Sequence, residues 1–199
     1  MPIALLDEPP LALPGALGPY RAKDYANLPD SPRCELIQGN FYVPPSPAIP
    51  HQFLAFELAK RIDVPAREAG GYVFMAPLDI RLADHSIVQP DVIYVSPARR
   101  GILGDRKGWI DGAPDLLIEI LSPGTARRDR VQKLDLYARS GIAEYWIVEP
   151  AERQIQFLVN ENGRFVVALP DGAVYRSAVL PEITLDLEAF WAEAARRLG

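Results

Sequence analysis

Glu119 is the first residue whose position suggests chemistry, because it interrupts the apolar segment Pro114-Asp-Leu-Leu-Ile-Glu-Ile-Leu-Ser-Pro123. A nearly unbroken apolar run predicts a strand that is covered on both faces. Side chains alternate along a strand, so Glu119 shares a face with Leu117 and Leu121 and points into covered space. A buried carboxylate needs a cation, a hydrogen-bond donor or a metal ion. An ordinary interior salt bridge with an arginine would also satisfy it.

Asp91 is the second candidate, and it opens another apolar strand in Gln89-Pro-Asp-Val-Ile-Tyr-Val95. An aspartate that follows a proline at the start of a strand is commonly only part of a turn. Two carboxylates on neighbouring strands have a further use, however. Hard divalent ions such as Mg²⁺ are usually held by one or two carboxylates together with water and a substrate phosphate.

Lys133 is the third candidate, in a chain that has seventeen arginines and only four lysines. It follows Asp129 by four residues and precedes Tyr137 by four, so the three share one face of a predicted helix. An exposed Asp129–Lys133 pair would account for this spacing without any function. Alternatively, a compact lysine cation could orient an attacking water or stabilise charge that develops at a phosphate.

Two further side chains lie in a helix predicted over residues 49–68. His51 could bind substrate or act as a general acid or base, although a histidine near a helix start more often caps or packs. Glu57 could supply another acid from the same helix. His85 and Cys34 have no spacing that is typical of zinc ligands, so zinc is not expected.

The hydrophobic pattern also predicts the elements that position these residues. A helical spacing of apolar residues runs over 49–68, and a second one runs over the arginine-rich stretch 125–140. Five segments are predicted to be strands, at 72–75, 78–82, 91–95, 115–121 and 144–148. Strand, helix and strand over 115–148 form a βαβ unit, which predicts that its two strands are parallel and central.

Hairpins are predicted near both ends of the chain. The first surrounds Gln38-Gly39-Asn40, the second joins strands at 154–159 and 164–169, and short helices are expected at 20–28 and 187–198. The predicted fold class is α/β, with a mixed β-sheet flanked by helices and with an N-terminal and a C-terminal β-hairpin.

Length and composition limit the classes of protein further. A chain of 199 residues with 49% hydrophobic residues is expected to form one domain. Eleven of the 20 prolines lie in the first 50 residues, so residues 1–19 are expected to form an extended arm before a domain at 20–199. A single cysteine, no signal-peptide pattern and no long apolar run predict a cytoplasmic protein outside the membrane.

These residues and their spacing resemble the PD-(D/E)XK nucleases, in which an acid on one strand precedes an acid and a lysine on the next. More narrowly, the chain resembles the Uma2 family of restriction-endonuclease-like proteins, once catalogued as a domain of unknown function. The matching motifs run over nearly the whole chain and are Glu35-Leu-Ile-Gln-Gly39, Pro47 with His51, Pro90-Asp91, Glu119-Ile-Leu-Ser-Pro-Gly-Thr125, Asp129-x3-Lys133-x3-Tyr137 and Gly141-Ile-Ala-Glu-Tyr-Trp-Ile-Val-Glu-Pro150.

The resemblance implies a restriction-endonuclease-like core and Mg²⁺-dependent cleavage of phosphodiesters in DNA, with Mn²⁺ as a substitute ion. It implies that Asp91 and Glu119 are metal ligands and that Lys133 orients the attacking water. The lysine of the broader motif would fall at position 121, which is Leu121 here. In the Uma2-like pattern the basic residue of the site lies on the following helix, and Lys133 is the matching position. By the same resemblance, Glu35 and Tyr137 are further site candidates, and a homodimer is expected by analogy with other nucleases.

The charge distribution leaves room for a nucleic-acid partner. The formal net charge is −5, which by itself argues against long-range attraction to phosphate. Residues 99–139, however, contain nine basic and six acidic residues, a balance of +3. Within this window, Arg127, Arg128 and Arg130 are the expected nucleic-acid contacts. Two alternatives remain: a non-catalytic dimeric interaction or regulatory module on the same fold, and a metal-dependent hydrolase of a small phosphorylated substrate.

Overall fold

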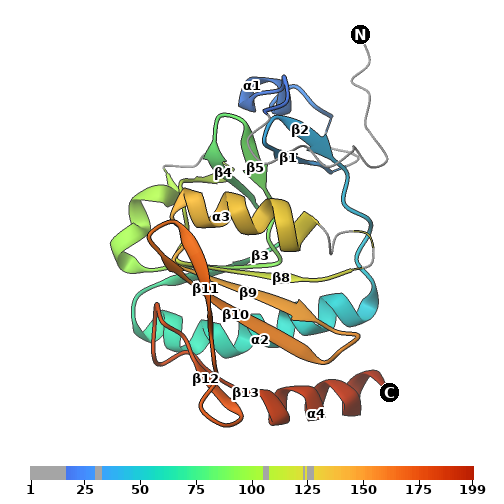
Figure 1. Ribbon diagram of the computed structural model, residues 1–199, viewed down its shortest axis with the longest axis vertical. Helices are drawn as coiled ribbons and strands as arrows, with labels where there is room; N and C mark the ends of the chain where they lie inside the picture. The colour runs from blue at the N-terminus through green and yellow to red at the C-terminus, as the bar shows by residue number, and fades with distance from the viewer. Residues whose placement is uncertain (1–16, 30–32, 105–107, 123, 125–127) are drawn as a thin grey trace.

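The computed structural model describes residues 17–29, 33–104, 108–122, 124 and 128–199. Its centre is a six-stranded mixed sheet with the strand order β11-β10-β9-β8-β6-β3 (Figure 1). These strands are β3 (Tyr72–Met75), β6 (Val92–Val95), β8 (Leu116–Ile120), β9 (Glu144–Glu149), β10 (Gln154–Glu161) and β11 (Arg164–Ala168).

The βαβ unit predicted from the sequence lies in the middle of this sheet. Strands β8 and β9 are parallel neighbours, and the connection between them contains a π-helical segment, η2 (Arg128–Lys133), followed by α3 (Leu134–Ser140). Every residue of β8 is buried, as its apolar sequence indicated. On its other side β8 pairs with the antiparallel strand β6, so both predicted carboxylate-bearing strands are adjacent.

A second mixed sheet of five strands lies beside the first, with the order β2-β1-β5-β4-β7. Its strands are β1 (Glu35–Ile37), β2 (Asn40–Tyr42), β4 (Asp79–Ala83), β5 (Ser86–Val88) and β7 (Trp109–Asp111). A two-stranded ribbon of β12 (Val174–Arg176) and β13 (Thr184–Asp186) completes the strands in the described residues. Two short helical elements are α1 (Ala22–Tyr25) and the 3₁₀ segment η1 (Pro97–Leu103).

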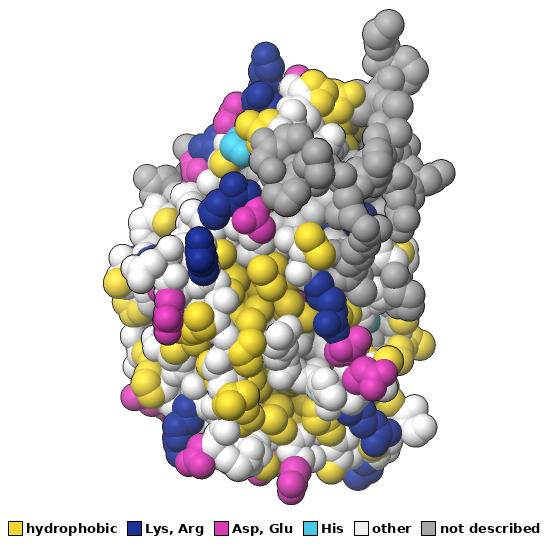
Figure 2. Space-filling view, viewed as in Figure 1, with side chains coloured by type: hydrophobic (Ala, Val, Ile, Leu, Met, Phe, Trp, Pro, Cys, Tyr) yellow, Lys and Arg dark blue, Asp and Glu magenta, His cyan; other side chains and the backbone are white. Residues whose placement is uncertain are grey.

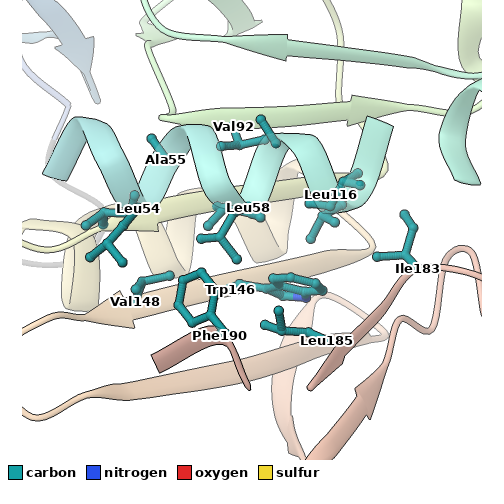
Figure 3. Packing of buried hydrophobic residues seen from close by; sticks show 14 of the residues in the cluster. Leu54, Ala55, Leu58, Val92, Leu116, Trp146, Val148, Ile183, Leu185 and Phe190 are labelled. Carbon is teal, nitrogen blue, oxygen red and sulfur yellow. The ribbon is translucent and has the colours of Figure 1, made fainter. Parts of the chain in front are cut away.

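Helices cover both faces of the six-stranded sheet (Figure 1). On one face, α2 (Ile49–Glu68) and α4 (Leu187–Leu198) pack onto alternate residues of β6, β8 and β9. Figure 3 shows this core, where Leu58 of α2 and Phe190 of α4 approach Trp146 of β9. On the other face, α3 packs over residues such as Leu117 and Ile147, and this second core also receives side chains from the five-stranded sheet. Glu119 belongs to the second face.

The expectation of a single mixed sheet is therefore wrong, because the described residues form two mixed sheets. The segment expected as a strand at 78–82 forms β4, but β4 pairs with β5 and β7 rather than with the strands that carry Asp91 and Glu119. Strand β5 in turn pairs with β1, which attaches the N-terminal hairpin to the same sheet. These strands of three to five residues are too short for the hydrophobic pattern to show which sheet they join.

Both predicted hairpins are present, and their turns explain why. In the first, Gln38 and Gly39 have φ values of 50° and 77°; in the second, Asn162 and Gly163 have 55° and 83°. Two successive residues with positive φ form the tight turns that best match the twist of paired strands. The predicted C-terminal helix is α4. The helix expected at 20–28 is reduced to α1.

The start of the described chain is attached to the first hairpin. The backbone N–H of Gly18 donates to the carbonyl of Gln38 at 2.7 Å, and that of Tyr20 to the carbonyl of Gly39 at 3.2 Å. Most of the arm expected over residues 1–19 lies outside the described residues, so the boundary at residue 20 remains a prediction. In the described part of the chain, no helix combines the length and apolar character needed to cross a membrane.

A buried carboxylate on β9 ties the C-terminal part of the chain to the central sheet. The Glu144 side chain is completely buried. Its two oxygens accept hydrogen bonds from Trp146 Nε1 (2.6 Å), Tyr175 Oη (2.8 Å), Ser177 Oγ (2.6 Å) and the backbone N–H groups of Ala178 (2.8 Å) and Val179 (3.1 Å). These five donors satisfy both oxygens of the buried carboxyl group, so Glu144 is a structural anchor.

Candidate active site

The side chain of Lys133 lies at the centre of a cluster of buried acids. Its Nζ is 2.7 Å from Glu119 Oε1, 2.9 Å from Glu35 Oε1 and 3.4 Å from Asp129 Oδ1. Lys133 is only 3% exposed. Glu119 comes from β8, Glu35 from β1 of the other sheet, and Asp129 and Lys133 from η2, so the cluster joins both sheets to the crossover connection.

Glu119 is held by two donors at one oxygen. Besides Lys133, the hydroxyl of Tyr137 donates to Glu119 Oε1 at 2.7 Å. Burial raises the pKa of Glu119 well above its usual value. The positive charge of Lys133 opposes that shift, while the nearby acids Asp129, Asp91 and Glu35 reinforce it. Additional positive charge nearby would therefore stabilise the ionised form of this side chain.

Lys133 itself is held as a cation. Burial lowers its pKa, but the charges of Glu119, Glu35 and Asp129 outweigh burial and raise the pKa well above its usual value. A lysine with a raised pKa keeps its proton at neutral pH, so it can donate hydrogen bonds and stabilise negative charge but is a poor proton acceptor.

Asp91 lies beside Glu119 on the neighbouring strand. The β6–β8 register pairs Val92 with Ile118, and its continuation by one residue sets Asp91 opposite Glu119, where both side chains point to the same face. Asp91 Oδ2 accepts a hydrogen bond from the backbone N–H of Ile120 at 2.7 Å. The sequence prediction that two acids meet on adjacent strands is confirmed.

His51 approaches the same carboxylate from the N-terminal end of α2. Its Nε2 lies 3.2 Å from Asp91 Oδ2, and both side chains are 15% exposed. Burial lowers the pKa of His51, but the hydrogen bond and charge of Asp91 outweigh burial and raise the pKa above its usual value. This contact brings His51 into the site.

Glu35 is fixed by the second sheet. The backbone N–H of Gln89 donates to Glu35 Oε1 at 2.8 Å, and the side chain is 3% exposed. The Gln89 amide in turn donates to Asp79 Oδ1 at 2.7 Å, and the hydroxyl of Tyr25 donates to that oxygen at 2.8 Å. A hydrogen-bonded chain therefore runs from α1 through the five-stranded sheet to Lys133.

The donor set of this cluster fits a divalent cation. Three acids (Glu35, Glu119 and Asp129) contact one lysine and Asp91 lies beside Glu119, so acidic groups outnumber the lysine, and carboxylate oxygens are the ligands that Mg²⁺ prefers. Within the described residues, no three Asp, Glu, His or Cys side chains are already arranged as ligands around one point. Mg²⁺ does not require such a cage, because it usually keeps several waters and takes only one or two carboxylates.

Asp129 is the member of the cluster that the sequence interpretation undervalued. It is 2% exposed, and the hydroxyl of Tyr145 donates to its backbone carbonyl at 3.3 Å. Its spacing of four residues from Lys133 was the available signal, but that spacing also fits a solvent-exposed pair. The exposed-pair interpretation is wrong, because both side chains are buried.

Glu57 is not brought to this cluster. It lies on α2, where Lys60 Nζ and Arg61 Nη1 donate to its two oxygens at 2.5 and 2.6 Å. Arg61 also lies over the ring of Phe190 of α4, on the opposite side of the central sheet from Glu119. Burial raises the pKa of Glu57, but the bonds from Lys60 and Arg61 outweigh burial and lower it.

The three arginines expected to contact nucleic acid have different surroundings. Arg127 lies outside the described residues. Arg128 lies with its guanidinium carbon 4.4 Å from the centre of the Tyr42 ring, and its Nη1 is buried without a hydrogen-bond partner among the described residues. Arg130 forms an ion pair with Glu149 at the surface.

Much of the positive charge counted over residues 99–139 is compensated in the fold. Arg99 pairs with Asp115 at 3.3 Å, Arg139 pairs with Asp135 on α3, and Lys133 is buried among acids. Because these partner acids are already among the six counted in the window, the pairs leave its balance of +3 unchanged. Of the two described candidates, Arg130 is ion-paired, whereas Arg128 is stacked on Tyr42.

Leu121 occupies the position of the lysine in the broader nuclease motif. It is 7% exposed and belongs to the core beneath α3, together with Leu136 and Ile142. The ammonium group near Glu119 comes from the helical connection instead, through Lys133.

Known proteins resemble this chain in both sequence and fold. The family model Uma2, described as "Putative restriction endonuclease", matches residues 22–188. The chain belongs to the Uma2 family. A similar solved structure is a putative nuclease belonging to DUF820 from Anabaena variabilis ATCC 29413, with a TM-score of 0.73 and 22% sequence identity over 88% of this chain and 99% of that chain. That likeness shows that the two proteins share a mixed α/β fold. No curated protein matches the chain significantly.

Proposed function

We propose that this Uma2 protein is a metal-dependent endonuclease that hydrolyses phosphodiester bonds in DNA. The observation that carries the proposal is the 2.7 Å contact between Lys133 Nζ and Glu119 Oε1, with Asp91 opposite Glu119 on the next strand. Two acids and a lysine on adjacent elements are the parts that a phosphodiesterase of the PD-(D/E)XK type requires. The family description supports the same class of activity.

Asp91 and Glu119 would hold Mg²⁺, or Mn²⁺ as a substitute, at the paired ends of β6 and β8. When bound, the ion supplies a Lewis acid for the phosphate and lowers the pKa of a coordinated water. Lys133, fixed by three acids, would orient the attacking water and stabilise the additional negative charge at the phosphorus centre. Since its pKa is raised, we assign it this electrostatic role rather than that of a general base.

The neighbours of these three residues would act by positioning. Tyr137 directs one oxygen of Glu119 through its hydrogen bond, which leaves the other oxygen for the ion. His51 would hold Asp91 in the same way from α2. Arg128, whose guanidinium is stacked on Tyr42, would contact a phosphate of the DNA backbone.

Glu119→Gln tests the assignment, because it keeps the shape and the acceptor oxygen but removes the negative charge. We expect the variant to lose about a hundredfold to a thousandfold in Mg²⁺-dependent cleavage, as removal of a key electrostatic group often costs. Glu57→Gln is the matched control, because it makes the same change on the opposite face of the sheet and should retain activity. Supercoiled plasmid, linear duplex and single-stranded RNA should be compared with Mg²⁺, Mn²⁺ and EDTA. Full cleavage by Glu119→Gln would refute the assignment.

The alternative is a non-catalytic dimeric module on the same fold. It is favoured by Leu121, which is packed in the core at the position of the motif lysine. Calorimetric titration of the full chain with Mg²⁺ and Mn²⁺ distinguishes the two. Binding that is lost in Glu119→Gln supports the nuclease, whereas the absence of binding to either ion supports the module.

A further inference from the structure

Three acids contact Lys133, and only one of them comes from the second sheet. Glu119 belongs to β8 and Asp129 to η2, whereas Glu35 lies on β1 of the five-stranded sheet. The position of the Lys133 ammonium beside Glu119 therefore depends on how Glu35 is held relative to the six-stranded sheet.

Glu35 is held by a backbone group that lies two residues before Asp91. The N–H of Gln89 donates to Glu35 Oε1 at 2.8 Å, and the same oxygen is 2.9 Å from Lys133 Nζ. The segment Gln89-Pro90-Asp91 connects β5 of the five-stranded sheet to β6 of the six-stranded sheet. Pro90 fixes its own φ and restricts Gln89 to extended backbone, so the segment is stiff. It therefore sets the position of Glu35 relative to Asp91.

The side chain of Gln89 is anchored in turn. Its Nε2 donates to Asp79 Oδ1 at 2.7 Å, and the hydroxyl of Tyr25 donates to the same oxygen at 2.8 Å. The Tyr25 hydroxyl also lies 3.1 Å from the carbonyl oxygen of Cys34, the residue before Glu35. A hydrogen bond to a carboxylate is stronger than one between neutral groups. The Gln89 amide is thus the part of the connecting segment that is fixed to the second sheet.

We propose that Gln89 is a positioning residue for the cleavage reaction, which places Lys133 through Glu35. This inference rests on the proposed function of the site. Asp91 has contacts of its own with the N–H of Ile120 and with His51, so it should stay in place when the Gln89 amide is removed. Glu35, by contrast, takes its backbone hydrogen bond from Gln89. It should shift, and Lys133 should shift with it.

The placement of Lys133 matters because positive charge does not gather on the surface that Figure 2 shows. On that face the described Lys and Arg side chains are scattered among apolar and neutral ones and form no continuous patch. A phosphate in the site would depend on the metal ion and on this one buried cation more than on a basic surface. Residues that hold the groups of a metal site in place typically change activity by about tenfold to a hundredfold when they are substituted.

The first experiment replaces Gln89 with methionine, which keeps the side-chain length and the backbone N–H but removes the amide. The single-turnover cleavage rate at saturating Mg²⁺ and DNA should fall by about tenfold to a hundredfold. The dissociation constant for Mg²⁺, measured by calorimetry, should change by less than about threefold, because Asp91 and Glu119 keep their places. A general loosening of the fold would weaken both the rate and the binding of Mg²⁺.

Asn160→Leu is the matched control, because it removes another half-buried amide. Asn160 Nδ2 donates to the carbonyl oxygens of Ala138 at 2.7 Å and Ile142 at 2.9 Å, beside the start of β9. Glu119 pairs with Ile147, further along that strand. The control should therefore lose stability but keep the wild-type cleavage rate.

The second experiment exchanges donor and acceptor between Gln89 and Asp79. Gln89→Glu sets two carboxylates against each other and should lower the rate at least as much as Gln89→Met. Adding Asp79→Asn restores one donor, one acceptor and the original net charge of the pair. The double variant should therefore recover to within about threefold of the wild-type rate, as expected for two residues that act through one contact.

Native-state hydrogen exchange, followed by NMR, adds a readout that does not involve cleavage. The amide at position 89 should exchange at least about tenfold faster in Gln89→Met, corrected for the intrinsic rate, while the core amides of β8 keep their rates. Unchanged exchange at position 89, a rate in Gln89→Met no lower than in Asn160→Leu, an equal loss of Mg²⁺ affinity, or failure of the double variant to recover would each overturn the proposal. An inactive wild type would instead refute the proposed function, so the two failures are distinguishable.

Discussion

Replacing Lys133 with methionine should strongly destabilise the protein, whereas replacing Glu119 with glutamine should not. Methionine has a similar length but no charge, so Lys133→Met leaves Glu35, Glu119 and Asp129 buried without their shared cation. Removing one partner of a buried ion pair costs about 3–5 kcal/mol. This is a large part of a typical free energy of unfolding of about 5–15 kcal/mol.

Glu119→Gln acts in the opposite direction on the same cluster. The glutamine oxygen can still accept hydrogen bonds from Lys133 and Tyr137, and one of four crowded negative charges disappears. We therefore expect the free energy of unfolding to stay within about 1 kcal/mol of the wild-type value or to rise, since a neutral acceptor avoids the cost of an excess buried charge. A residue whose loss abolishes cleavage but not stability is retained for chemistry rather than for the fold.

Urea denaturation in EDTA, followed by tryptophan fluorescence and circular dichroism, measures both changes. Arg139→Met is the control, because it removes the exposed pair with Asp135 on the adjoining helix and should cost less than about 1 kcal/mol. The reasoning fails if Lys133→Met costs no more than Arg139→Met, or if Glu119→Gln is the more destabilised of the two site variants.

Three further predictions concern other parts of the molecule. Glu144→Ala should lower the free energy of unfolding by at least about 3 kcal/mol, because it leaves several buried donors without an acceptor; a loss below about 1 kcal/mol in the same urea assay would contradict this. Burial raises the pKa of Cys34 to about 11, so the thiolate is scarce at pH 8 and iodoacetamide should modify the native protein at least about a hundredfold more slowly than the urea-unfolded chain; equal rates would show that the thiol is accessible. Arg128→Met should weaken DNA binding and reduce its salt slope by about 1, whereas Arg130→Met should have the smaller effect, because Arg130 is paired with Glu149; equal losses by fluorescence anisotropy would refute the difference.

The positions of Asp91 and Glu119 could be predicted because each lies in or beside an apolar strand. Apolar runs predicted both strands, and the alternation of side chains predicted that Glu119 points into covered space. That Asp91 lies opposite Glu119 on the same face follows from the β6–β8 register of the structure. The sheet order that makes those strands adjacent agrees with the prediction. Lys133 was a candidate from its spacing to Asp129 and Tyr137, and the family resemblance supported it. The π-helical turn at Arg128–Lys133, from which Lys133 contacts Glu119, was not indicated by the spacing of apolar residues.

Features that depend on distant partners escaped the sequence interpretation. Glu35 meets Lys133 only because β1 joins a second sheet with β4 and β5, and pairing between three-residue strands far apart in the chain leaves no local pattern. Glu144 was part of an expected core strand, but its donors include residues 175–179, some thirty positions later. Hydrophobic periodicity reports which face of a segment is covered and says little about which segment covers it.

The net charge of −5 has a structural explanation that removes its apparent conflict with a DNA substrate. Among the described residues, the buried charged side chains are six acids and one base: Glu35, Glu57, Asp115, Glu119, Asp129, Glu144 and Lys133. The whole chain has 26 acidic and 21 basic residues. Without the six buried acids and the one buried base, twenty acidic and twenty basic residues remain. These twenty include the charged residues outside the described ranges. The acidic excess is thus held inside, and half of the buried acids surround Lys133 in the proposed metal site.

Long-range repulsion of phosphate by the surface should be weak, and attraction should depend on a few unpaired cations such as Arg128. One of these buried acids, Glu119, is a proposed ligand of the ion, and two others, Glu35 and Asp129, hold the lysine beside it.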